Sequence, residues 1–223
     1  DRGAAENWLV RTFCHAVSNR GALDWTFYCT LGREGRLDET VRAHGGRVVY
    51  SPVPLDRKVE FARALRNEIR AGGYEALHCH HDLVSAFYLT TSLGTPLARR
   101  IVHVHNADEV VPVRGAWKQT LLREPMRRTC LALADKIVGV SNHTLDTFLR
   151  GRSRRPGRDL VLYHGIDPGS FLRAPADRGR FRRKLGLPQD ALVFLFAGRL
   201  VPEKNPGFAL EVLGELRRLE PRA

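Results

Sequence analysis

Residues 192–206 read LVFLFAGRLVPEKNP, and the rest of the fold can be worked out from what this stretch predicts. Its first part is a short apolar run over 192–197, which is typical of a strand buried on both faces of a parallel sheet. The run ends at Gly198, where the lack of a side chain lets the backbone approach a ligand. Asn205 is a good helix N-cap and Pro206 suits the first helical position. The stretch therefore predicts a strand, a turn and a helix.

Two cations, Arg199 and Lys204, stand in this turn, directly before the helix that we expect over 207–219. A helix N-terminus attracts anions, because its first N–H groups are unpaired and the helix dipole is positive there. Two cations beside such a terminus suit a diphosphate. The spacing alone is equally compatible with a surface loop whose Arg and Lys side chains are simply solvated.

The same alternation of short apolar runs and longer helical patterns extends back through the chain. Repeated β-α-β spacing predicts an α/β fold with a parallel sheet, and right-handed crossovers make it a Rossmann-like, doubly wound sheet. Such sheets bind ligands at the carboxyl ends of their strands. The expected strands are 25–30, 47–51, 76–80, 101–105, 136–140 and 160–163, and the expected helices are 6–19, 56–71, 83–93, 115–134 and 142–150.

A stretch rich in Gly and Pro over 167–190 separates this pattern from the strand at 192–197. We interpret it as an interdomain linker between a first Rossmann-like domain, 1–166, and the start of a second one, 191–223. A single βα unit cannot bury its own apolar faces. The sequence is therefore expected to be part of a longer protein, with the second domain incomplete here.

The net charge of the chain is compatible with several kinds of binding partner and does not identify one. The formal net charge of +12 comes mostly from Arg residues spread along the chain. An anionic membrane, a nucleic acid or a phosphorylated substrate would each fit that charge, so a non-catalytic polyanion-binding module stays open. We expect no nucleic acid partner, because no basic groove with interleaved aromatic residues and no nucleic-acid motif is present.

The chain has four cysteines, at positions 14, 29, 79 and 130, and no two of them form a CxxC pair. This pattern favours reduced thiols in the cytoplasm.

Histidines gather at the ends of two expected strands, in HCHHD (78–82) and HVHN (103–106). Residues two apart on a strand share a face, so His78 and His80 point to one side, and so do His103 and His105. Paired HxH elements also occur in metal-dependent hydrolases, which is the alternative function for this chain. The first element is not HxHxDH, however, and no further His/Asp set completes a ligand cage. We therefore expect no metal, and buried, hydrogen-bonded rings for His78 and His103.

The segment GRLVPEKNP resembles the donor-phosphate loop of the retaining GT-B glycosyltransferases of family 4. Three further segments resemble that family in the same order: GAAE (3–6) its Gly-Gly-x-Glu loop, KIVGVS (136–141) the strand and turn after its long central helix, and YHGID (163–167) its Y-N-G-I-D segment. Two positions depart from the family pattern. Arg2 stands where the first Gly often stands, and His164 replaces the Asn, so a role of that amide does not carry over.

The resemblance implies transfer of a sugar from a nucleotide-diphosphate sugar to an acceptor hydroxyl with retention of configuration. It assigns the donor diphosphate to Gly198, Arg199 and Lys204, and it implies that neither a divalent metal nor another cofactor is needed. His105 is the expected catalytic residue, in contact with the transferred sugar or the acceptor. The family's contacts to the base and ribose, including a glutamate pair, come from later parts of its second domain. Residues 1–223 alone are therefore expected to be inactive.

Four more residues are assigned by the resemblance to the loops around the acceptor and donor: Gly3, Glu6, His80 and Asn106. For Gly3 and Glu6, a simple capping turn at a helix start explains the same residues.

The expected acceptor is a glycan or a lipid-linked glycan, in cell-envelope or exopolysaccharide synthesis at the inner face of the cytoplasmic membrane. The helix expected over 115–134 carries Trp117, Leu121 and Leu122 with cations beside them. It is either a contact with an anionic membrane or a helix packed on the sheet with its Arg residues solvated.

Overall fold

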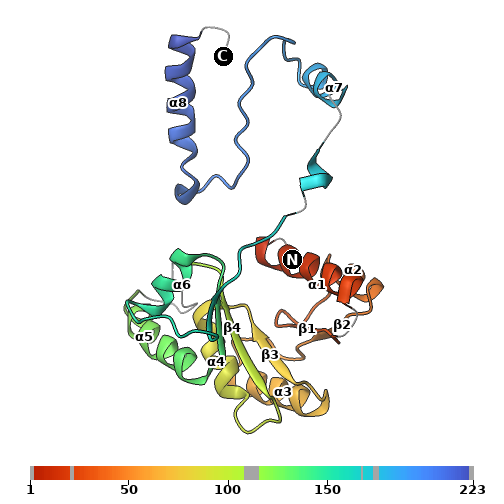
Figure 1. The fold of residues 1–223 in the computed structure, drawn as a ribbon, viewed down its shortest axis with the longest axis vertical. Helices are drawn as coiled ribbons and strands as arrows, with labels where there is room; N and C mark the ends of the chain where they lie inside the picture. Colours follow the sequence, from red (N-terminus) through yellow and green to blue (C-terminus); the bar gives the residue numbers. More distant parts are fainter. Residues whose placement is uncertain (1–2, 21–22, 108–115, 167, 173–175, 221–223) are drawn as a thin grey trace. The chain divides into compact units, whose positions relative to one another are not determined.

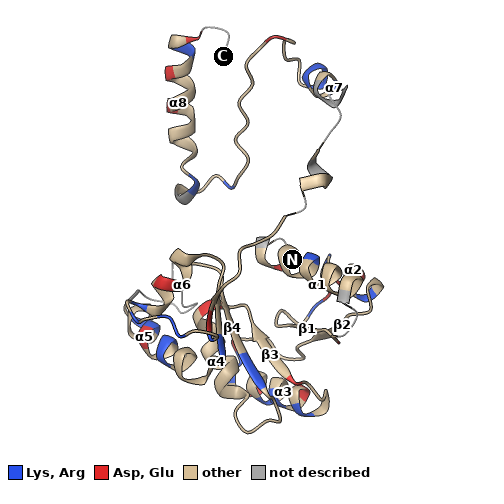
Figure 2. Ribbon diagram, viewed as in Figure 1, with Lys and Arg blue, Asp and Glu red and all other residues tan. Residues whose placement is uncertain are grey.

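The structure is a computed structural model, and it describes residues 3–20, 23–107, 116–166, 168–172 and 176–220. The chain divides into two compact units, Asp1–Gly165 and Ile166–Ala223. Lys and Arg are spread over elements of both units, with Asp and Glu among them (Figure 2). The net positive charge therefore does not mark out one element as a binding surface.

The strands of the first unit are all parallel, as expected, and lie in two sheets (Figure 1). In one sheet β1 (Thr26–Cys29) pairs with β2 (Arg47–Tyr50), and in the other β3 (Ala76–Cys79), β4 (Arg99–Val104), β5 (Lys136–Gly139) and β6 (Asp159–Val161) follow in chain order. No backbone ladder joins the two sheets within the described residues. Side chains connect them instead, since the Arg47 guanidinium donates to the Tyr74 hydroxyl beside β3.

Helices alternate with the strands along the first unit, which confirms the β-α-β pattern. They are α1 (Ala4–Arg20), α2 (Asp38–Ala43), α3 (Lys58–Ala71), α4 (Ser85–Thr91), α5 (Ala116–Leu133) and α6 (Asn142–Leu149), with a 3-10 turn over Asp82–Val84 before α4. The short α2 was not expected from the sequence. None of the helices that the structure describes is both long and apolar enough to cross a bilayer.

Both faces of the β1–β2 sheet are covered, as a doubly wound fold requires. Phe27 of β1 packs with Phe13 of α1, at 5.3 Å between ring centroids. The next residue, Tyr28, points the other way and lies 6.0 Å from the ring of Phe61 in α3. In Figure 1, α1 and α2 accordingly lie on one side of β1 and β2, and α3 lies on the other.

The larger core lies against the sheet formed by β3 to β6. It takes Phe61, Leu65 and Ile69 from α3, whose spacing of four residues places them on one face of the helix. Val102 and Val104 of β4 also point into this core, and both are fully buried. The residue between them, His103, therefore faces the opposite side of the sheet.

Gly139 shows how closely the helices approach this sheet. A Cβ at this position would lie 2.7 Å from Cβ and 3.0 Å from Cα of Leu145 in α6. The first turn of α6 therefore packs at backbone distance on the end of β5. Only glycine allows that approach.

The second unit contains the chief difference between sequence and structure. Residues 192–197 form no strand, although an apolar strand was expected there. A strand needs hydrogen-bonding partners, and the described part of this unit holds no other strand to supply them. The expected helix does form, as α8 (Pro206–Leu219), and no residue of α8 is buried. A further helix, α7 (Ala176–Lys184), lies within the stretch expected to be a linker.

Candidate functional site

The two histidine elements meet where β3 and β4 end. His78 is opposite Ile101 in the parallel β3–β4 ladder. The segments that follow the two strands, which carry His80 and His105, therefore leave the sheet side by side. The ring centroids lie 4.2 Å apart for His78 and His80, and 4.6 Å apart for His103 and His105. Across the two strands, those of His80 and His103 are 5.1 Å apart. The expectation that each pair shares one face is confirmed, and both pairs lie on the same side of the sheet.

His80 and His105, two of the expected site residues, are joined directly. Nδ1 of His80 lies 3.0 Å from Nε2 of His105, so one ring donates to the other. Burial lowers the pKa of His105, and the neighbouring carboxylates of Asp82 and Glu6 oppose that effect. Burial, together with the adjacent imidazoles, lowers the pKa of His80 and brings that of His103 to about 3. The buried rings are therefore neutral near pH 7.

Asp82 fixes the segment that carries His105 and Asn106. Its Oδ1 accepts hydrogen bonds from the backbone N–H of His105 at 2.6 Å and of Asn106 at 3.4 Å. Its Oδ2 accepts from Nδ2 of Asn106 at 2.7 Å. Asp82 adopts a left-handed backbone conformation, with φ of 42°, which is uncommon for a residue other than glycine. We find in Asp82 a positioning residue to which the sequence pattern assigned no role.

Trp8 of α1 closes the site on the side away from the core. Its ring stacks on that of His164 at 4.5 Å and meets the ring of His103 edge-on at 5.2 Å. It also lies 6.1 Å from the ring of His105. His164, the residue that replaces the family's Asn, thereby becomes part of the site. The only signal for Trp8 in the sequence was its place on the apolar face of an expected helix.

Gly3 and Glu6 lie at the start of α1, near the same histidines. The Glu6 carboxylate folds back over Gly3, where a Cβ would collide with it. The negative charge of Glu6 also raises the pKa of both His81 and His105 against the dominant effect of burial. The first unit thus brings together the five expected site residues that it contains, namely Gly3, Glu6, His80, His105 and Asn106.

The three residues expected at the donor diphosphate, Gly198, Arg199 and Lys204, belong to the second unit. Lys204 ends a 3-10 turn over Pro202–Lys204, and its Cγ would lie 3.9 Å from a Cβ at position 198. Asn205 then caps α8, because its Oδ1 accepts from the backbone N–H of Phe208 at 3.3 Å. The turn and cap that the sequence predicted are confirmed. Both cations are exposed, at the N-terminal end of α8.

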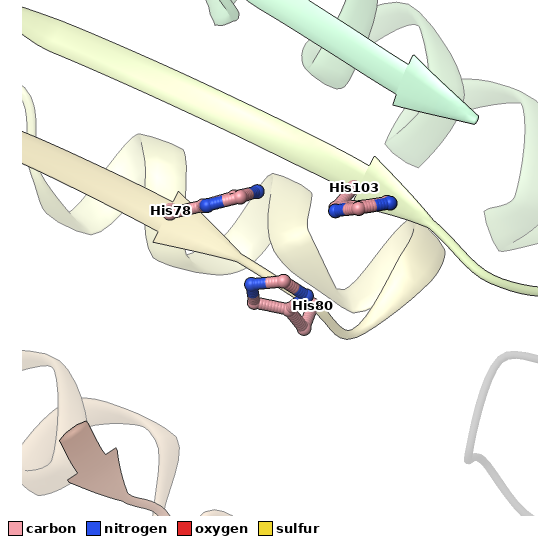
Figure 3. Close-up of side chains that lie close together, drawn as sticks. All are labelled: His78, His80 and His103. Carbon is pink, nitrogen blue, oxygen red and sulfur yellow. The ribbon is translucent and has the colours of Figure 1, made fainter. Parts of the chain in front are cut away.

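Among the residues that the structure describes, one group of side chains could hold a metal ion. The ligand atoms of His78, His80 and His103 all lie within 4.8 Å of one another (Figure 3).

The model of Glycosyltransferase Family 4 matches residues 8–170 of this chain. The chain is 29% identical over 150 residues to a D-inositol 3-phosphate glycosyltransferase of Streptomyces avermitilis, and 31% identical over 170 residues to one of Actinosynnema mirum. These alignments cover 66% and 72% of this chain, and 32% and 39% of the two relatives. The chain thus spans roughly a third of the length of these relatives.

Solved structures agree on the fold. Crystal structures of Anabaena Alr3699/HepE, in complex with UDP and with UDP-glucose, match this chain with a TM-score of 0.68. The matches cover 96% of this chain and 55% of the other, at 16% and 17% sequence identity. At that identity they confirm the Rossmann-like α/β fold class and nothing finer. Because the family model spans most of the chain, from Trp8 past both histidine elements and His164, the chain belongs to Glycosyltransferase Family 4.

Proposed function

We propose that the protein containing this chain transfers a sugar from a nucleotide-diphosphate sugar to an acceptor hydroxyl. The observation that carries this proposal is the loop 198–206 in a member of Glycosyltransferase Family 4. There, two exposed cations, Arg199 and Lys204, precede the Asn205-capped start of α8. The similar HepE structures contain UDP or UDP-glucose, which supports a nucleotide sugar as the class of donor.

The chemistry follows from the charge that develops during transfer. As the bond from the sugar to the diphosphate breaks, negative charge grows on the leaving diphosphate. Arg199, Lys204 and the N-terminal turn of α8 would stabilise that charge more in the transition state than in the bound donor. Two fixed cations can take the part that a divalent metal plays elsewhere, so we propose a reaction that needs no metal and no other cofactor.

In the first unit, we propose that His105 contacts the transferred sugar or the acceptor. A neutral imidazole can donate one hydrogen bond to a sugar hydroxyl or accept one from it. Asp82 would keep His105 in place, and Glu6, His80 and Asn106 would lie beside it. Retention of configuration, a role in cell-envelope or exopolysaccharide synthesis, and the inactivity of residues 1–223 alone are further parts of this proposal, all based on the family resemblance.

Activity should be measured on the full-length gene product against a panel of UDP-, GDP- and ADP-sugars, with and without EDTA. We expect one donor to be turned over, EDTA to have no effect, and Lys204→Ala to lower kcat by about 100-fold, as loss of one charge-stabilising donor does. Lys184→Ala is the matched control, because Lys184 is an exposed lysine of the same unit at the end of α7. Turnover that EDTA abolishes and that Lys204→Ala leaves unchanged would contradict the proposal.

We also propose that α5 contacts an anionic membrane, where a lipid-linked acceptor would be found. Trp117 is 67% exposed and Leu121 is 64% exposed, so the packed alternative does not describe this end of the helix. The ammonium of Lys118 lies 5.3 Å from the centre of the Trp117 ring. Exposed apolar side chains beside a cation suit the boundary between lipid headgroups and acyl chains.

Cosedimentation with vesicles tests this contact. We expect binding to phosphatidylglycerol vesicles, weaker binding to phosphatidylcholine vesicles, and a large loss on replacing both Trp117 and Leu121 by Ser. Leu31→Ser is the control, since Leu31 is 70% exposed on a turn after β1. Equal binding of all these variants to phosphatidylglycerol would show that α5 is not the contact.

A further inference from the structure

Three imidazoles gather beside the ends of β3 and β4. His78 lies within β3, His80 follows β3 directly, and His103 lies within β4 (Figure 3). One nitrogen from each ring lies within 4.8 Å of the nitrogens from the other two. Nitrogens that bind one tetrahedral zinc ion at about 2.0–2.1 Å lie about 3.4 Å from one another, so the three rings would move closer together on binding.

His103 is the residue that most needs an explanation. It is completely buried, and neither Nδ1 nor Nε2 has a hydrogen-bond partner among the described residues. A neutral imidazole carries one donor and one acceptor, and buried polar groups in proteins are almost always paired. The nearby rings do not serve, because His78 lies almost parallel to His103, at 6° between planes, and Trp8 meets it edge-on. A bound cation would use the nitrogen lone pair that the protein leaves unpaired.

His80 makes a second hydrogen bond, as metal-binding histidines usually do, here to an imidazole. Its Nδ1 is held by Nε2 of His105 at 3.0 Å, which leaves Nε2 of His80 for a ligand bond. Histidines that bind metals almost always make such a second hydrogen bond, which fixes the ring and its tautomer. His78 is exposed, so solvent can reach the group from the side of β3.

We propose that His78, His80 and His103 bind one divalent transition-metal ion of the zinc class. Three imidazole nitrogens suit zinc and its neighbours, whereas magnesium and calcium require oxygen ligands. Three protein ligands leave a fourth position for water in tetrahedral geometry. The ion would tie the end of β3 to β4 and would take no part in sugar transfer, which we propose to need no metal. It is distinct from the donor chemistry proposed for Arg199 and Lys204, and this inference does not depend on that proposal.

The test is a titration of the full chain with cobalt, after all metal has been removed with a chelator. Cobalt replaces zinc in tetrahedral nitrogen sites and gives a visible absorption band there. We expect one equivalent of cobalt to bind with that band, and zinc but not magnesium to raise the thermal unfolding midpoint, since an ion that binds only the folded state stabilises it.

The deciding comparison uses His78→Gln, because an exposed position tolerates the change without unfolding. Cobalt affinity should fall at least about 10-fold in this variant, the smallest loss seen even for outer-shell partners of metal sites. His143→Gln, which changes an exposed histidine on α6, should bind cobalt as the original chain does. The proposal is overturned if both variants bind cobalt equally well, or if the original chain shows neither the absorption band nor a thermal shift with zinc.

Discussion

At the scale of single residues, the site depends on a carboxylate whose backbone is strained. Asp82 has a φ of 42° and accepts three hydrogen bonds from His105 and Asn106. A strained conformation persists only where the surrounding contacts compensate for it. We infer that the position of His105 depends on Asp82 more than on any packing contact of its own.

Replacing Asp82 by Ala should therefore displace His105 and Asn106 without unfolding the first unit. We expect a stability loss of about 0.5–1.5 kcal/mol, the usual net contribution of a hydrogen bond, because these bonds are partly buried or exposed. We also expect a fall in kcat for sugar transfer that exceeds any rise in KM. The kcat of Asp82→Asn should lie between that of the original protein and that of Asp82→Ala. The Asn side chain keeps an oxygen for His105 but places an NH2 group against Nδ2 of Asn106. A variant Asp82→Ala with unchanged kcat would show that Asp82 has only a structural role.

The four cysteines separate into two classes by burial. Cys79 and Cys130 are buried, while Cys14 and Cys29 are partly exposed. Burial raises the pKa of the Cys130 thiol from 9.0 to about 12, and it raises that of Cys79 as well. The neutral thiol is thus the form favoured by folding. The contribution of the buried, neutral Cys130 thiol to the free energy of unfolding is complete below pH 9. It is lost as the pH rises from 9 towards 12, because the unfolded chain then ionises first.

Alkylation of the native protein at pH 8 should therefore modify Cys14 and Cys29 and leave Cys79 and Cys130 unmodified, because the thiolate is the reactive form. Mass spectrometry of tryptic peptides measures this directly, and the denatured chain, with all four thiols modified, is the control. Rapid labelling of Cys130 in the native protein would contradict the described core.

The residues that the sequence could predict are those on regular elements. A period of two residues was enough to place His78 with His80 and His103 with His105. The roles of Asp82 and Trp8 could not be predicted from such a local pattern. The contacts of Asp82 join residues 23 and 24 positions apart in sequence, and those of Trp8 reach strands from a separate helix. Neither contact leaves a local pattern in the chain.

At the scale of elements, local signals predicted most of the helices, missed α2 and α7, and predicted one strand wrongly. Asn205 and Pro206 correctly marked the start of α8, because a cap acts within a few residues. The apolar run 192–197 has a strand-like composition but no partner strand in the described part of its unit. Strand formation depends on partner strands, including ones far away in sequence, and a local pattern carries no information about them.

The cap of α6 offers a test at this scale. The Ser141 Oγ accepts a hydrogen bond from the backbone N–H of Thr144 at 3.1 Å. Ser141→Ala should lower the free energy of unfolding by about 1 kcal/mol, and Ser141→Asp should keep the cap and most of the stability. Denaturant titration of the three proteins measures the difference. If the Ala and Asp variants are equally stable, the cap does not stabilise α6.

At the scale of the whole molecule, the chain holds two sets of expected site residues in two units. The first unit gathers Glu6, His80 and His105 around the ends of β3 and β4. The second presents Arg199 and Lys204 at the start of α8. The family model covers residues 8–170 and so reaches only the first set. We propose that one reaction uses both sets, with the first unit on the acceptor side and the second at the donor diphosphate.

The central claim is sugar transfer from a nucleotide-diphosphate sugar, and proton NMR of the anomeric signals tests it most directly. The full-length gene product is incubated with each donor of the UDP, GDP and ADP panel, and the spectrum is followed over time. The account predicts that one donor is consumed and that the first product keeps the anomeric configuration of that donor. No consumption of any donor, or a first product of inverted configuration, would contradict it.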